Sequence, residues 1–292
     1  MVLPSVAFWV FDRTIRFTKL IRFGFPLATI KVVGEKEDIT LKVTIPKPKN
    51  WNHFAGSFIW IQFLAPSSWW QSHPFTCIVE RQDGDGDREE VIVLYCKVKE
   101  GVTEDLYKRL LTTPAKEGKI RVAVEGPYVD ACQNFYNHNV TFIAGGSGIP
   151  GLYSEAKSLA QTKQRGLSRI IRLFWIVKNY ESVGWFKNEL ASLEDLGVQV
   201  TIFVTRYKKV PCGTKEINAI DRLKATLPFV LFIERRPDLE EIINEDVKSP
   251  SVGFVACGHP RMVDEVRALV VQSLDLHPGQ RLDFYELLQV WS

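Results

Sequence analysis

The length, composition and charge of the chain limit what kind of protein it can be. With 292 residues, 46% of them hydrophobic, we expect about two folded domains. The formal net charge is only +3, from 37 basic and 34 acidic residues, and no arginine-rich run occurs, which argues against a nucleic-acid partner. The five cysteines are odd in number, widely spaced and without a Cys-x-x-Cys pair, which is typical of a reducing compartment such as the cytosol.

The N-terminal segment combines apolar and aromatic side chains with evenly spaced basic ones. Arg13, Arg16, Lys19 and Arg22 follow an apolar start at three-residue intervals. A signal peptide carries its basic residues before the apolar run, so this order is wrong for one. It is the order found where a transmembrane helix emerges into the cytoplasm, although a surface amphipathic helix of a soluble protein has the same pattern. We expect residues 1–23 to be a juxtamembrane basic amphipathic segment, while no stretch of the sequence is apolar for long enough to span a membrane.

Residues 24–135 have the pattern of short β-strands. Runs rich in β-branched and aromatic residues, punctuated by Gly, Pro and Asp, predict a small antiparallel β-barrel, with one helix at residues 103–112. The acidic stretch at residues 83–90 imitates the start of a calcium loop. Arg88 and Leu94 stand where that loop needs Gly and Glu, so we interpret the stretch as a solvated hairpin loop and expect no metal site.

Residues 136–292 alternate strands with helices. This alternation predicts a parallel, doubly wound sheet that binds its ligands at the carboxyl ends of its strands. Gly146, Gly148 and Gly151 satisfy Gly-x-Gly-x-x-Gly between an apolar strand and a helix, where Pro150 suits the first turn. The motif alone is weak, since glycines also occur at ordinary strand-to-helix turns. In this context, free amides and the helix dipole favour a bound pyrophosphate, and therefore a dinucleotide.

Basic residues follow several of the predicted strands. A unit that binds NAD typically places an acidic residue at the end of its second strand, whereas the 2'-phosphate of NADP needs a cation. Here Lys178 ends the second strand, Arg206 ends the third, and Arg235 and Arg236 follow a later apolar run. Each alone is consistent with an ordinary solvated charge. Together they favour NADPH over NADH.

The segment from His73 to Thr76 follows a tryptophan pair in a predicted strand. It contains no nucleophile with an adjacent base and orienting acid, and no second histidine stands nearby for a metal. Taken by itself, His73 is interpreted as a structural histidine.

Taken together, these motifs resemble those of a known family. A β-barrel with His-Pro-Phe-Thr, then a sheet domain with a glycine turn, then a strand ending in Cys257 and Gly258, resembles the ferredoxin-NADP reductase superfamily. More specifically, the order is similar to the cytosolic dehydrogenase domain of fungal, yeast-type ferric reductases and NADPH oxidases. The resemblance covers nearly the whole chain. It implies an FAD-binding β-barrel domain at residues 24–135 and an NADPH-binding α/β domain at residues 136–292.

The resemblance also implies which residues hold the flavin. Thr76 would lie near the reactive edge of the isoalloxazine, and Val129 replaces the small residue that the family usually has after its Gly-Pro-aromatic turn. The implied flavin residues are His73, Pro74, Phe75 and Thr76 against the ring, Lys97, Gly101, Val102 and Thr103 by the diphosphate, and Gly126, Pro127 and Tyr128 in the turn.

The same resemblance implies the nicotinamide residues. The place of hydride transfer would be bordered by Thr76, Cys257 and Trp291. Trp291 would stack over the flavin until nicotinamide displaces it. The other interpretation of Cys257 is a buried structural thiol. Ser292 after the tryptophan departs from the family pattern. The implied residues are Gly145, Gly146, Ser147, Gly148, Ile149 and Pro150 at the pyrophosphate, Lys178, Arg236 and Pro237 at the 2'-phosphate, and Cys257 and Gly258 beside the nicotinamide.

The function implied by the resemblance is hydride transfer from NADPH to FAD. Single electrons would then pass to haem in a membrane domain that this sequence lacks, and on to ferric or cupric chelates, with the chain at the cytosolic face of the plasma membrane. Two alternatives stay open: the dehydrogenase domain of an NADPH oxidase that reduces oxygen to superoxide, and a redox-inactive nucleotide-binding interaction module. The intact motifs argue against the module. The tryptophan near the end and the basic segment favour the reductase over the oxidase.

Overall fold

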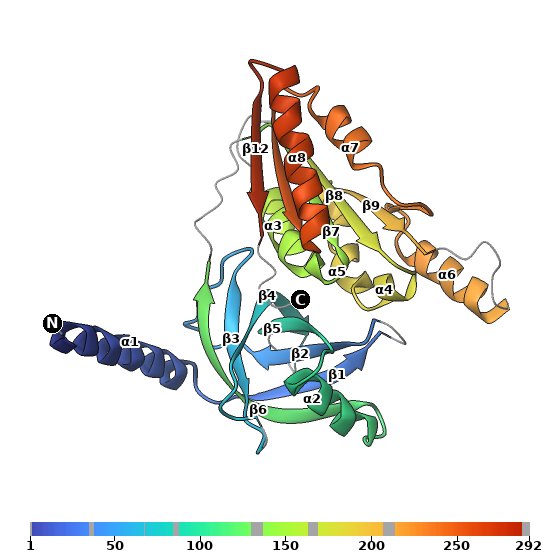
Figure 1. Cartoon of the computed structure of the whole chain (residues 1–292). Helices are drawn as coiled ribbons and strands as arrows, with labels where there is room; N and C mark the ends of the chain where they lie inside the picture. The colour runs from blue at the N-terminus through green and yellow to red at the C-terminus, as the bar shows by residue number, and fades with distance from the viewer. Residues whose placement is uncertain are drawn as a thin grey trace. The chain divides into compact units, whose positions relative to one another are not determined.

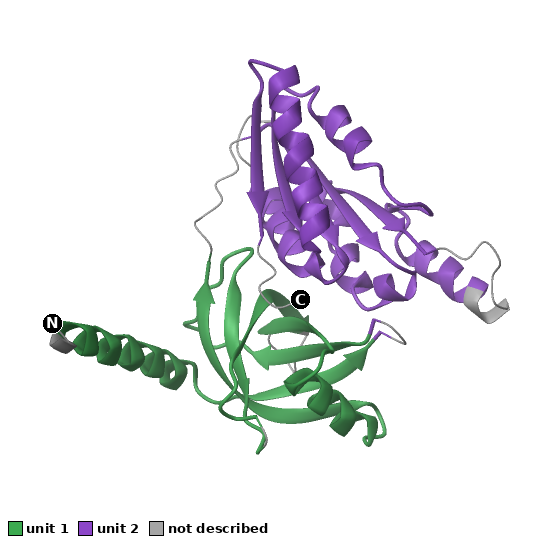
Figure 2. Cartoon of the chain, viewed as in Figure 1, with its two compact units in different colours: residues 1–33, 39–131, 291 green, residues 34–38, 132–290, 292 purple. Residues whose placement is uncertain are grey.

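The chain divides into two compact units, coloured separately in Figure 2. The barrel unit comprises residues 1–33 and 39–131, and the sheet unit comprises residues 34–38 and 132–290. Trp291 and the acidic loop at residues 84–87 lie outside the described residues. The computed structural model describes residues 2–34, 38–66, 68–83, 88–129, 137–162, 169–206 and 214–287.

Six antiparallel strands close the barrel in the order β1-β2-β5-β4-β3-β6, which confirms the predicted antiparallel β-barrel (Figure 1). In β2, the alternate side chains of Leu41, Val43 and Ile45 are fully buried. Alternation of this kind follows from the two-residue period of a strand and directs one apolar face into the barrel. The strands are β1 (Leu27–Val33), β2 (Thr40–Pro46), β3 (Phe58–Phe63), β4 (His73–Asp83), β5 (Arg88–Lys97) and β6 (Glu117–Tyr128).

One helix, α2 (Val102–Leu111), follows β5 and confirms the helix predicted in this region. It begins after Gly101, whose φ of 105° is easily adopted only by glycine. Val102, Leu106 and Leu110 recur every four residues and are buried in the barrel core. This spacing places them on one face of the helix.

The N-terminal segment forms a single helix, α1 (Val2–Phe23), which packs against β6. At its end Phe23 is buried and meets the ring of Trp51 edge-on, with 5.9 Å between ring centroids. Most of the other large apolar side chains of α1 are exposed, including Phe8 at 75% and Phe11 at 64%. Among the described residues, no helix combines the length and the apolarity that crossing a bilayer requires. The position of this helix beside a membrane stays a prediction.

The sheet unit contains six strands, and every strand pair in it is parallel. The parallel α/β sheet predicted from the sequence is therefore confirmed. Its order is β10-β9-β8-β7-β11-β12, so the direction of winding reverses between β7 and β11. The strands are β7 (Asn139–Gly145), β8 (Ile170–Val177), β9 (Gln199–Val204), β10 (Leu231–Ile233), β11 (Ser251–Cys257) and β12 (Arg281–Glu286).

Helices cover both faces of this sheet. Because parallel crossovers are right-handed, the reversal between β7 and β11 puts the helices before and after β11 on the face opposite α3. In agreement, α7 and α8 pack against each other in front of the sheet in Figure 1. Open parallel sheets bind ligands where the winding reverses. The helical elements are η1 (Gly146–Gly148), α3 (Ile149–Gln161), α4 (Glu181–Gly184), α5 (Lys187–Ala191), η2 (Glu194–Leu196), α6 (Thr214–Thr226), α7 (Leu239–Asp246) and α8 (Pro260–Leu276).

Candidate functional site

Two backbone segments meet where the winding of the sheet reverses. The register pairs Ala144 with Cys257, so the chain leaving β7 runs beside the chain leaving β11. A Cβ added at Gly148 would lie 2.6 Å from the carbonyl oxygen of Cys257, and one added at Gly258 would lie 2.8 Å from the Cα of Gly145. Real Cβ atoms are not found so close to other backbone. Glycine is therefore required at both positions by the approach of two backbones.

The glycine turn leads directly into α3. Gly146 has a φ of +53°, and its carbonyl oxygen accepts a 2.9 Å hydrogen bond from the indole nitrogen of Trp175. Pro150 occupies the first turn of α3, where its missing N–H costs nothing. The first amides of a helix lack intrahelical partners, and the helix dipole makes this end attractive to an anion. The turn from Gly145 to Pro150 therefore offers backbone N–H donors at the start of a helix. Trp175, which is fully buried on β8, was not predicted from the sequence.

Two of the predicted cations are neighbours at the same edge of the sheet. The backbone N–H of Arg206 donates a 2.8 Å hydrogen bond to the carbonyl of Lys178, which extends the pairing of β8 and β9 by one residue. Both side chains are exposed. Arg236 and Pro237 follow β10, the next strand of the sheet, and Arg236 is exposed as well. The carboxyl ends of three adjacent strands thus each carry a basic residue.

Glu234, an acidic residue at this edge, already has hydrogen-bond and ion-pair partners. The carboxylate of Glu234 accepts a 2.5 Å hydrogen bond from the hydroxyl of Tyr180 and lies 3.2 Å from the ammonium of Lys224. Burial and this carboxylate raise the pKa of Tyr180 to about 12. Arg235 is paired with Glu241 at 3.1 Å. The side chains of Lys178, Arg206 and Arg236 are exposed at this edge, and basic side chains there suit a phosphate ligand.

Cys257 is a buried thiol. Its exposed fraction is 4%, and burial, with a smaller contribution from Glu286, raises its pKa to about 12. The thiol is therefore protonated at neutral pH and is no nucleophile. Its sulfur would lie 3.1 Å from a Cβ at Gly148, so it is part of the packing between the two segments. That Cys257 and Gly258 border a nicotinamide stays a prediction.

The predicted flavin segment opens strand β4. The register places His73 opposite Ile61 and Thr76 opposite Phe58, so alternate residues face opposite sides of the barrel wall. Phe75 packs against the barrel core. The Nε2 atom of His73 is buried and has no hydrogen-bond partner among the described residues. Burial also lowers the pKa of His73, which keeps the imidazole neutral. An orphaned buried nitrogen is what a site for a polar ligand would leave.

The Gly-Pro-aromatic turn lies next to this segment. Gly126 has a φ of +143°, and a Cβ there would lie 3.1 Å from a methyl carbon of Ile59. Its carbonyl accepts a 3.1 Å hydrogen bond from the indole nitrogen of Trp51. Phe58 pairs in register with both Thr76 and Tyr128, and its ring stacks on Tyr128 with 5.7 Å between centroids. The structure thus brings Thr76 and the turn together on either side of Phe58.

Helix α1 is attached to the same turn. The Tyr128 hydroxyl donates a hydrogen bond to Glu125, whose carboxylate also lies 3.6 Å from the guanidinium of Arg16. The ammonium of Lys19 lies 4.6 Å from the centroid of the Tyr128 ring. Burial and the neighbouring carboxylate raise the pKa of Tyr128. Sequence patterns could not reveal this network, because its two halves are more than 100 residues apart.

The predicted diphosphate residues lie at the start of α2. The hydroxyl of Thr103 accepts from the backbone N–H of Lys99 and donates to its carbonyl, both at 2.9 Å, so its side chain is engaged locally. Val102 is buried in the barrel core. Gly101, Val102 and Thr103 can therefore meet a diphosphate through their backbone N–H groups. Lys97, half-buried at the end of β5, is the basic side chain among these predicted residues. No group of His, Cys, Asp and Glu in the described part of the chain is arranged to hold a metal ion.

Comparison with known proteins finds family models that match parts of both units. A family model described as "FAD-binding domain" matches residues 22–131, and one described as "Ferric reductase NAD binding domain" matches residues 137–271. The chain belongs to the ferric reductase family. A probable ferric reductase transmembrane component of Candida albicans is 37% identical over 99% of this chain and 44% of its own length. Ferric reductase transmembrane component 4 of Saccharomyces cerevisiae is 31% identical over 99% of this chain and 44% of its own length. The chain thus spans less than half the length of these curated relatives.

Solved structures support the fold of this ferric reductase family chain. A ferredoxin NADP+ reductase from Neisseria gonorrhoeae, solved with bound FAD and NADP, has a TM-score of 0.55 and 15% identity, covering 90% of this chain and 99% of that chain. The ferredoxin reductase in carbazole 1,9a-dioxygenase has a TM-score of 0.56 and 14% identity, covering 90% and 70%. Both confirm the ferredoxin-NADP reductase architecture.

We predict that Gly148→Ala destabilises the sheet unit. The added methyl group collides with the Cys257 carbonyl, and overpacking against backbone should lower the free energy of unfolding by about 1–3 kcal/mol. Gly184→Ala is the control, because no atom lies within 4 Å of a Cβ there. Urea unfolding of both variants measures the difference. Equal stability of the two would show that the two segments do not approach as closely as described.

Glu155, on α3, gives stability a specific dependence on pH. Burial raises its pKa from 4.5 to about 7, so the folded chain binds the proton more tightly than the unfolded chain. Stability is then lost as the pH rises from about 4.5 to 7. Between pH 5 and pH 8, wild type should lose about 2 kcal/mol relative to Glu155→Gln. The stability of the control variant Glu265→Gln, at an exposed position, should vary with pH as that of wild type does. If the difference in stability between wild type and Glu155→Gln is the same at every pH, the prediction is wrong.

Proposed function

We propose that this chain is the dehydrogenase part of a flavin-dependent ferric reductase. It would transfer hydride from NADPH to FAD, and single electrons would pass to haem in a membrane part and on to ferric or cupric chelates. Membership of the ferric reductase family and the names of its relatives support this proposal. Its main structural support is the approach of the Gly145–Gly148 turn to Cys257 and Gly258 beside a basic strand edge.

The barrel unit has features that suit FAD. The buried Nε2 of His73 lacks a partner among the described residues, and strand alternation puts His73 on the side of the barrel wall opposite Thr76. Phe58 pairs in register with Thr76 and Tyr128, and its ring stacks on Tyr128 next to Pro127, an arrangement that suits a flat aromatic ring. The N–H groups at the start of α2 suit a diphosphate, with Lys97 as a nearby cation.

The sheet unit has features that suit NADPH. The turn from Gly145 to Pro150 leads into α3, so the amides of Ser147 and Ile149 belong to a helix N-terminus that suits a pyrophosphate. Lys178, Arg206 and Arg236, with Pro237 ordering the chain after Arg236, would bind the 2'-phosphate. Cations at this position distinguish NADPH from NADH.

The residues of the chain would position the cofactors and exclude water. When bound, the nicotinamide supplies a hydride and the flavin passes electrons on singly, which is the cofactors' own chemistry. The hydroxyl of Thr76 would orient the flavin by a hydrogen bond, and the neutral thiol of Cys257 would pack beside the nicotinamide. Trp291, outside the described residues, would cover the flavin face. No side chain is assigned as a general acid or base.

The proposed function is tested anaerobically by mixing the chain with FAD and following the flavin's visible absorption after NADPH or NADH is added. The proposal expects rapid bleaching, faster with NADPH than with NADH. FAD that binds but is bleached by neither coenzyme would contradict hydride transfer by this chain.

Coenzyme choice should depend on the strand-end cations. A double variant that carries both Lys178→Met and Arg236→Met should have an apparent KM for NADPH about 10-fold to 100-fold higher than wild type. The reason is that charge-assisted hydrogen bonds contribute about 1.5–3 kcal/mol each. The KM for NADH should change less than threefold. Exposed Lys187→Met serves as the control and should change neither value. Equal effects on both coenzymes would remove these residues from the 2'-phosphate site.

Thr76→Ala should slow flavin reduction about tenfold, as expected for the loss of one hydrogen bond of about 1.5 kcal/mol. Stopped-flow absorbance measures the rate, and unfolding by urea checks that stability is kept. Thr29→Ala, a half-buried threonine elsewhere in the barrel wall, should leave the rate unchanged. If the two variants reduce flavin at the same rate, Thr76 does not act in this step.

A further inference from the structure

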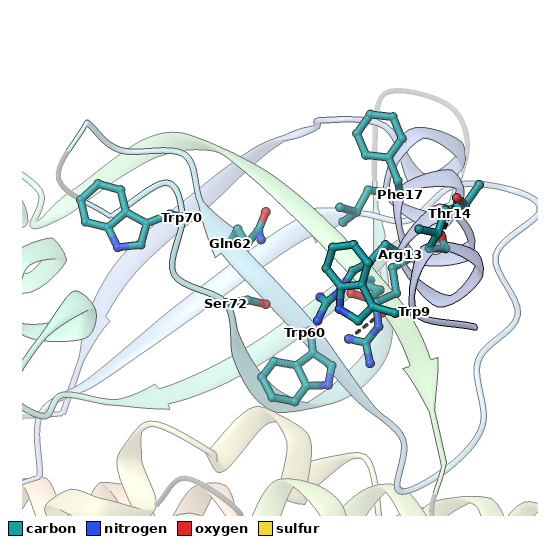
Figure 3. A pocket seen from close by; sticks show the side chains of 12 residues that line it. Trp9, Arg13, Thr14, Phe17, Trp60, Gln62, Trp70 and Ser72 are labelled. Carbon is teal, nitrogen blue, oxygen red and sulfur yellow. Dashed lines mark hydrogen bonds and ion pairs between the residues drawn. The ribbon is translucent and has the colours of Figure 1, made fainter. Parts of the chain in front are cut away.

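A groove of about 700 Å³ lies between α1 and the outer face of the barrel (Figure 3). None of its lining residues belongs to the flavin or NADPH sets described above. Trp9 and Phe17 line it from α1, Trp60 from β3, and Trp70 from the segment that precedes β4. Small-molecule sites typically have volumes of about 300–1,000 Å³, so this groove is large enough for a ligand.

The walls of the groove leave large apolar rings in contact with water. The exposed fractions are 60% for Trp9, 61% for Phe17 and 58% for Trp70. Single exposed apolar residues are normal, but a cluster of aromatic rings around one hollow marks a binding surface. The occupant should therefore present an apolar portion of its own.

The charges of the groove do not cancel. Arg16 is paired with Asp12 at 3.0 Å and with Glu125 at 3.6 Å, and Glu125 also accepts from Tyr128. The guanidinium of Arg13 instead lies over the ring of Trp9, 5.5 Å from its centroid. Among the described residues that line the groove, Arg13 is thus a positive charge without an ion-pair partner.

This combination selects between kinds of occupant. A purely apolar partner would bury Arg13 without a counter-charge, which is costly. A soluble phosphate would satisfy Arg13 but leave the aromatic rings exposed. A molecule with an anionic head and an apolar tail satisfies both.

We propose that the groove binds one anionic phospholipid, with an acyl chain between the aromatic walls and the phosphate beside Arg13. The acyl chain is then covered by the aromatic rings of Trp9, Phe17, Trp60 and Trp70, in the way that tryptophan rings lie among lipids at membrane interfaces. The Arg13 guanidinium binds the phosphate with two parallel N–H donors. The site belongs to the barrel unit alone and does not depend on the proposed redox function.

Calorimetric titration of the 292-residue chain with dioctanoyl phosphatidylglycerol, below its critical micelle concentration, tests the proposal. Dioctanoyl phosphatidylcholine provides the same chains with a neutral head group, and inorganic phosphate provides the anion without chains. The proposal expects saturable one-to-one binding of phosphatidylglycerol, at least fivefold weaker binding of phosphatidylcholine, and no measurable binding of phosphate. Equal binding of both lipids, binding of phosphate alone, or no lipid binding would overturn it.

Paired variants on the same helix locate the site. Arg13→Gln should weaken phosphatidylglycerol binding about fivefold, the usual contribution of one basic residue near an anionic lipid. Arg22→Gln removes an equal charge from outside the groove and should change it less than twofold. Phe17→Ser should weaken binding about tenfold, as for the loss of one buried apolar ring, whereas Phe8→Ser, outside the groove, should not. Equal losses within either pair would show general attraction to α1 and overturn the assignment to the groove.

Discussion

The approach of two backbones at the carboxyl ends of β7 and β11 is the constraint on which the sheet unit's site depends. Gly148 and Gly258 are needed because a single added carbon at either position would push the two segments apart. Trp175 then holds the turn before α3 in place, because its indole nitrogen donates a hydrogen bond to the carbonyl of Gly146. The cations at the ends of β8 and β9 then lie along the same edge. The proposed nucleotide site thus depends on backbone geometry more than on any single side chain.

In the barrel unit, side-chain contacts hold the residues of the proposed flavin site together. Phe58 stands between Thr76 and Tyr128, and the turn at Gly126 is held by the indole of Trp51. Tyr128 is in turn fixed by Glu125, which joins it to α1. The conformation of the proposed flavin face is therefore coupled to helix α1, and the same Arg16 and Glu125 side chains also line the aromatic, basic groove.

Much of this architecture could be predicted from sequence, because strand alternation and the glycine turn are local signals. Leu41, Val43 and Ile45 show the two-residue period directly, and the switch to alternating helices marks the second unit. The edge strands β10 and β12 escaped prediction, since three residues are too few for periodicity and β12 mixes polar and aromatic residues without a clear alternation. Trp175 and the Tyr128 network depend on contacts between distant segments. The roles of His73 to Thr76 came from family resemblance and, like that of Trp291, stay predictions.

The most direct test of the central claim is amide hydrogen exchange at residues 146–149 with and without NADP+. NADP+ needs no flavin and undergoes no reaction, so the measurement isolates the proposed pyrophosphate site. The account predicts that these amides exchange at least tenfold more slowly when NADP+ is bound, because they donate to its phosphates. Saturating NADP+ that protects other segments and leaves these amides unchanged would contradict it.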